Sequence, residues 1–241
     1  MMRAAAVGTL LLCVPALTAC ESTQSRSARL RAEAKSRAPE KGLKVTKLAP
    51  GVKVASTALL SDPNGTALVV ELRNSSKRSL AAVPLAVDIA DGKGASVYRN
   101  DTPGLETSLV SAALLPARRT EVWINDQVTA TGTPERAKAR AGVGGRVLKA
   151  APPRIVVRVP RLQRDPTSGL AATGRIVNRS KIDQRDLVVN VVARKGGRIV
   201  AAGRAVVRRL RAGQDARYQA FLIGKADGAR LQASAPPTTL P

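Results

Sequence analysis

The chain of 241 residues contains no histidine, two cysteines and only 2% aromatic residues. Without histidine it has no Ser–His–Asp triad and no histidine-ligated metal site. The scarcity of aromatic side chains weakens interpretations that need stacking platforms, such as glycoside hydrolysis and binding of single-stranded nucleic acid. No G-x-S-x-G motif and no phosphate-binding P-loop occur in the sequence. We therefore expect a protein that is not an enzyme and needs no cofactor or metal.

One cysteine ends an apolar run near the N-terminus. Arg3 precedes an apolar segment over 4–17 of the length typical of a signal peptide, and the segment leads into Leu17-Thr18-Ala19-Cys20. These four residues resemble the lipobox of bacterial lipoproteins. The resemblance implies cleavage before Cys20 and a diacylglyceryl group on its sulfur, and two acyl chains hold a protein firmly to a bilayer.

This resemblance predicts the location of the protein and the state of its thiols. We expect it at the cell membrane, lipid-anchored on the extracytoplasmic face. Cys13 would leave with the signal peptide, so the mature chain would have no disulfide. An ordinary signal peptide with a chance cysteine at position 20 is the alternative.

The net charge of +23 is unevenly distributed along the chain. Residues 51–126 are neutral, whereas residues 154–241 carry +13. An Arg- and Ala-rich composition, typical of a GC-rich genome, accounts for part of the positive charge. It does not explain why residues 51–126 have no net positive charge.

A repeat organises most of the mature chain. Residues 64–97 align without a gap with residues 168–201 at an offset of 104, so that Asn74 matches Asn178. Apolar residues alternate in both copies, which predicts strands with one buried face. Further along, 115–123 matches 210–218 at an offset of 95, which places nine extra residues of the first copy within 98–113.

Single residues of the repeat have two interpretations each. Asn74 and Asn178 stand in N-x-S, but we interpret both as turn residues rather than glycan acceptors. Trp123 aligns with Tyr218, and we expect both to anchor the core rather than form ligand platforms. The extra stretch within 98–113 is either a binding loop or a longer hairpin.

The strand and turn pattern predicts two antiparallel β-sandwiches of immunoglobulin-like type. It resembles the FxLYD family of bacterial extracytoplasmic modules, through Gly174-Arg175-Ile176-Val177-Asn178 and the turn at 210–214. The motif that names the family would fall on 87–91, where its Phe and Tyr are missing. The resemblance covers about 160 residues and implies no catalytic residues.

The predicted organisation has six parts. They are a signal peptide (1–19), a lipidated Cys with a basic and partly helical tether (20–43), a first β-sandwich (44–130), a linker (131–153), a second β-sandwich (154–232) and a disordered tail (233–241).

The first functional hypothesis is a membrane-anchored, non-catalytic binding or scaffolding module of the cell envelope, with an envelope protein as partner. The alternative is a protein that binds polyanions, such as anionic lipid or a cell-wall polymer, through the basic second module. Nucleic acid is the weaker ligand because an exported chain without a recognition helix does not suit it. The candidate polyanion-binding residues are Arg194, Lys195, Arg198, Arg204, Arg208, Arg209 and Arg211.

Overall fold

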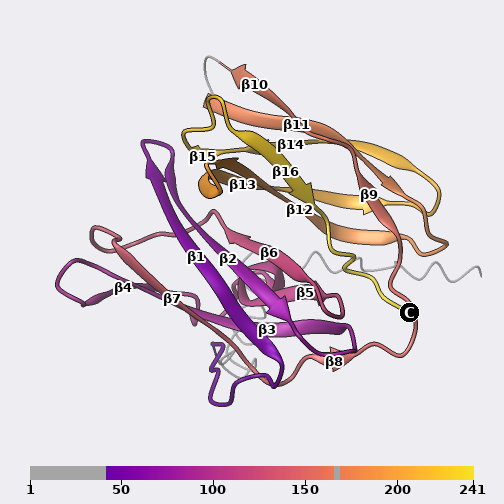
Figure 1. Cartoon of the computed structure of the whole chain (residues 1–241), viewed down its shortest axis with the longest axis horizontal. Helices are drawn as coiled ribbons and strands as arrows, with labels where there is room; N and C mark the ends of the chain where they lie inside the picture. The colour runs from indigo at the N-terminus through magenta and orange to yellow at the C-terminus, as the bar shows by residue number, and fades with distance from the viewer. Residues whose placement is uncertain (1–41, 166–168) are drawn as a thin grey trace, which may run out of the picture. The chain divides into compact units, whose positions relative to one another are not determined.

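The computed structural model describes residues 42–165 and 169–241 (Figure 1). These residues form antiparallel sheets and one short helix, α2 (Thr107–Val110), which confirms the predicted all-β sandwich fold. Lys41–Pro241 form one compact unit. The predicted signal peptide, the lipobox with Cys20 and the tether up to residue 41 lie outside the described residues. Within the described ranges, no helix is long and apolar enough to cross a membrane.

The first sandwich consists of two layers. One sheet has the order β1 (Val52–Asp62), β2 (Gly65–Asn74), β6 (Thr120–Asn125). The other is built on β3 (Leu80–Ala90). The first half of β3 pairs with β5 (Ser111–Leu115) and β8 (Arg146–Val147), and its second half pairs with β4 (Ser96–Arg99) and β7 (Arg136–Ala141). Between the layers lies an aliphatic core closed by Trp123.

The second sandwich repeats this plan. One sheet contains β10 (Arg161–Asp165), β11 (Gly169–Asn178) and β14 (Asp215–Phe221), with β9 (Ile155–Val157) also paired to β11. The other has the order β15 (Ile223–Gly224), β13 (Arg198–Leu210), β12 (Gln184–Lys195), β16 (Arg230–Ser234). Its core is aliphatic and contains Tyr218.

The repeat extends to individual hydrogen bonds. The Asn74 side-chain amide donates to the carbonyl oxygens of Arg78 and Leu115, at 2.9 and 3.0 Å. The Asn178 amide donates to those of Ile182 and Leu210, at 2.8 and 3.2 Å. Both asparagines are fully buried, so the interpretation as turn residues rather than glycan acceptors is confirmed.

The two aromatic anchors also occupy equivalent places. Trp123 lies opposite Val70 and Tyr218 lies opposite Gly174, and both rings are buried, as predicted. Gly174 makes room for the larger reach of the tyrosine, because a Cβ there would lie 2.6 Å from the Tyr218 hydroxyl oxygen.

The stretch 131–153, predicted as a linker, differs from that expectation. It contains β7, which pairs with β3 as β16 pairs with β12. The two strands align in sequence as well, as "RAKARA" (136–141) and "RLQASA" (230–235). Their core-facing residues are mostly alanines, so the alternation that marks a strand is weak in hydropathy.

The predicted disordered tail (233–241) differs in the same way. Its first residues belong to β16. Farther on, the Gln184 side chain donates to the Thr239 carbonyl oxygen at 3.0 Å and accepts from the Thr238 backbone N–H at 3.0 Å. The buried Gln184 amide therefore ties the C-terminal segment to the start of β12.

Candidate functional site

The two sandwiches share an apolar contact surface. Its buried centre comes from β2 and β6 of the first sandwich and from β12 and β13 of the second, and consists of Val69, Ile124, Val192 and Ala202. The alternation in β2 predicts one buried face, but Ala67, Leu68, Val69 and Val70 are all fully buried. The second face of β2 is buried because the other sandwich covers it.

Two ion pairs cross this contact surface. Arg204 Nε lies 2.8 Å from Asp126 Oδ1, and the Arg204 backbone N–H donates to Asp126 Oδ2 at 2.9 Å. The Arg204 side chain is only 4% exposed. Arg194 pairs with Glu71 at 2.5 Å, with both side chains about four-fifths buried. Since removal of one partner would leave a buried charge, both pairs fix the position of one sandwich against the other.

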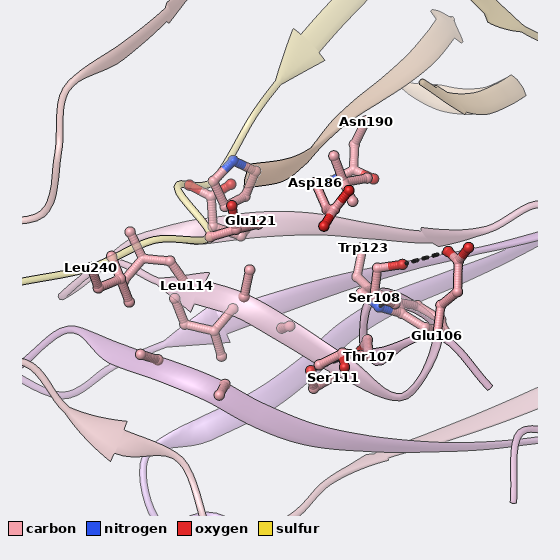
Figure 2. A pocket seen from close by; sticks show the side chains of 18 of the residues that line it. Glu106, Thr107, Ser108, Ser111, Leu114, Glu121, Trp123, Asp186, Asn190 and Leu240 are labelled. Carbon is pink, nitrogen blue, oxygen red and sulfur yellow. Dashed lines mark hydrogen bonds between the residues drawn. The ribbon is translucent and has the colours of Figure 1, made fainter. Parts of the chain in front are cut away.

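A cleft of about 770 Å³ opens beside this contact surface (Figure 2). Its first side comes from β5, β6 and α2, and its second side from β12, β13 and the C-terminal segment. Apolar side chains line it on both sides, including Leu114, Trp123, Val188, Val206 and Leu240. A volume of this size suits a small-molecule ligand.

The extra stretch of the first copy shapes one end of the cleft. It carries α2, whose Ser108 lines the cleft together with Glu106, Thr107 and Ser111. The Trp123 indole N–H donates to the Ser108 carbonyl oxygen at 2.8 Å, and Arg204 donates to Ser108 Oγ at 3.2 Å. This stretch was predicted to be either a binding loop or a longer hairpin. Its position favours a binding loop, because contacts with Trp123 of the first sandwich and Arg204 of the second hold it beside the cleft.

A carboxyl group with unusual protonation also lines the cleft. Burial raises the pKa of Glu121 to about 7, although the charge of Arg119 opposes the shift. Among the described residues, no hydrogen bond to the Glu121 carboxyl group is found. Near neutral pH the protonated group can donate a hydrogen bond to a ligand and the ionised group can accept one.

The predicted polyanion-binding residues do not form one free face. Arg194 and Arg204 take part in the ion pairs between the sandwiches. Arg208 lines the cleft, and Arg209 pairs with Asp183 at 3.4 Å on the surface. The remaining three, Lys195, Arg198 and Arg211, are exposed.

The sequence contains one signal for the contact between the sandwiches. Arg204 is a lone charge inside the small and apolar run "VAAGRAVV" of residues 200–207. A charged residue within such a run is expected to have a buried partner. Its partner Asp126 lies 78 residues away, and no local pattern identifies it.

The described residues contain no group of three or more His, Cys, Asp or Glu side chains placed to hold a metal ion. No known protein-family model matches the chain, and no curated protein matches it significantly. The similarity to FxLYD modules and to bacterial lipoproteins therefore stays a prediction from the motifs.

Proposed function

We propose that this protein is a lipid-anchored, non-catalytic binding protein on the extracytoplasmic face of the cell membrane, and that it binds a small amphipathic ligand between its sandwiches. The cleft is the observation that supports binding. The lipobox ending at Cys20 supports the anchor.

The lining of the cleft suits an apolar body with one polar, anionic end. Trp123, Val188 and Val206 offer apolar contact. Arg185 and Arg208, two arginines on neighbouring strands, offer positive charge to an anionic end, while Glu106 and Asp186 also line the cleft. Glu121 adds a hydrogen-bonding group that is about half protonated near neutral pH. A ligand of this kind would bury its apolar part and pair its anionic end with the arginines.

Trp123 makes the cleft testable, because it is the single tryptophan of the chain. The probe is 1-anilinonaphthalene-8-sulfonate, which has an apolar ring system and one negative charge. We expect it to quench Trp123 fluorescence saturably, and Val206→Asp should weaken the apparent affinity by about tenfold, since it places a charge where the apolar rings bind.

Val143→Asp is the matched control, because Val143 and Val206 are each 48% exposed and Val143 does not line the cleft. It should leave quenching unchanged. An equal loss of probe affinity in Val206→Asp and Val143→Asp, or no saturable quenching in the wild type, would contradict binding in the cleft.

The anchor has its own test. A metabolic fatty-acid probe should label the wild-type protein in bacterial cells and leave Cys20→Ser unlabelled. Labelling of both proteins to the same extent would disprove lipidation at Cys20.

A second candidate function, binding of a polyanion by the second sandwich, is favoured by its charge of +13 over residues 154–241. The exposed arginines of its outer sheet, described below, also support it.

A further inference from the structure

The outer face of the sheet β9–β10–β11–β14 carries a row of arginines. Arg175 on β11 lies directly opposite Arg217 on β14. On the other side, the Arg158 backbone N–H donates to the Arg175 carbonyl oxygen at 2.8 Å. Arg161 lies opposite Thr173, two residues from Arg175 on the same face of β11. All four arginines are exposed, and we call them, with Phe221 and Val159, the outer basic face.

The alternation of the strands places these side chains outward. Ile176 and Tyr218, the neighbours of Arg175 and Arg217, point into the core. The first sandwich contacts β12 and β13, which belong to the opposite sheet. The outer basic face therefore lies on the side of the second sandwich away from the cleft.

This arrangement of charge does not stabilise the fold. Like charges directly opposite each other on neighbouring strands destabilise a sheet. Asp215 pairs with Arg175 at 2.8 Å and offsets one of the arginines. No acidic partner of Arg158, Arg161 or Arg217 is found among the described residues. A ligand that brings negative charge would relieve the repulsion.

One exposed apolar side chain shares this face with the arginines, and a second is adjacent to one of them in sequence. Phe221, the single phenylalanine of the chain, shares the outer side of β14 with Arg217 and is 48% exposed. Val159 lies between Arg158 and Arg161 in sequence and is 83% exposed. A linear polymer of phosphates would use the charges but leave these apolar groups in water. The boundary of an anionic bilayer satisfies both kinds of side chain.

We propose that the outer basic face docks the second sandwich on the surface of a bilayer that contains anionic lipid. The inference deepens the second candidate function and rests on it. It does not need the lipid on Cys20. The segment between Cys20 and Lys41 can span up to roughly 70 Å when extended, so the anchor would leave this face free to reach the membrane.

The test uses the chain from residue 20 onward with Cys20→Ser, which keeps the whole compact unit Lys41–Pro241 and removes the acyl chains. Its binding to vesicles of phosphatidylglycerol and phosphatidylcholine is measured by co-sedimentation. We expect partitioning that falls with salt and is absent on pure phosphatidylcholine. The triple variant Arg158→Gln, Arg161→Gln, Arg217→Gln should partition on the order of 100-fold less, because each basic side chain contributes about fivefold at an anionic surface.

The matched control removes the same number of charges elsewhere on the second sandwich, through Lys195→Gln, Arg198→Gln and Arg211→Gln. It should lower partitioning much less than the first triple variant. A further variant, Phe221→Ser, keeps every charge and should still lower partitioning several-fold because the ring no longer inserts. Circular dichroism establishes that each variant folds, and Arg→Lys at the three positions should keep most of the binding.

Three results would overturn the inference. The first is an equal loss of partitioning in both triple variants, which would show that only net charge matters. The second is salt-dependent binding to soluble polyphosphate together with no binding to anionic vesicles. That second result would keep the polyanion function and reject the bilayer. The third is failure to bind either probe, which would reject both, without bearing on the cleft or the anchor.

Discussion

At the scale of single residues, Glu121 makes the protein sensitive to pH. Burial raises its pKa in the folded state to about 7, from an ordinary value of 4.5. Between these two values the folded chain binds more protons at this group than the unfolded chain does. The contribution of Glu121 to the free energy of unfolding is therefore largest below about pH 4.5 and falls as the pH rises towards 7.

This fall in unfolding free energy with rising pH leads to a prediction for Glu121→Gln, which keeps the shape of the side chain and removes its titration. Between pH 5 and pH 8 the wild type should lose about 2 kcal/mol of unfolding free energy relative to the variant. Urea denaturation of both proteins at the two pH values measures the difference. Parallel behaviour of the two proteins would show that Glu121 titrates normally.

Residues whose roles depend on neighbouring sequence were predictable. The aligned pairs Asn74–Asn178 and Trp123–Tyr218 were identified from the repeat, and the structure places both pairs as expected. The partner of Arg204 was not predictable, because an ion pair between strands of different sandwiches leaves no regular spacing in the sequence.

At the scale of strands, β13 shows how one element contributes to two surfaces. Arg204 and Arg209 both lie on it, and each has an acidic partner. The Arg204 side chain is 4% exposed and the Arg209 side chain is 56% exposed. This difference in burial decides what each pair contributes to stability, since exposed pairs contribute little and broken buried pairs cost much.

The two arginines therefore form a matched comparison. Arg204→Ala should lower the free energy of unfolding by about 3 kcal/mol, because it leaves Asp126 without its buried partner. Arg209→Ala should change it by less than about 1 kcal/mol. Chemical denaturation measures the free energy of unfolding of both variants. A similar loss of unfolding free energy in the two would mean that the Arg204–Asp126 pair does not hold the sandwiches together.

Strand prediction succeeded where large apolar residues alternate, as in β3 and β12. It missed β7 and the last two residues of β16, where alanine faces the core and hydropathy hardly alternates. It also predicted one buried face for β2, because local sequence does not show that a second sandwich covers the other face.

At the scale of the whole described unit, the joining of the two sandwiches is the feature on which the cleft depends. The predicted linker would let them move independently, and a cleft lined from both would then have no fixed shape. In the structure, part of that stretch belongs to β7 and β8, which pair with β3, and an apolar cluster with two ion pairs joins the sandwiches.

The distance between the sandwiches in solution tests this claim most directly. The chain from residue 20 onward with Cys20→Ser contains no cysteine, so Lys93→Cys and Gln214→Cys introduce one spin label on an exposed turn of each sandwich. Pulsed electron paramagnetic resonance should give a single narrow distance distribution, which Arg204→Ala broadens. A broad distribution in the parent protein, as a flexible linker would produce, would contradict the account.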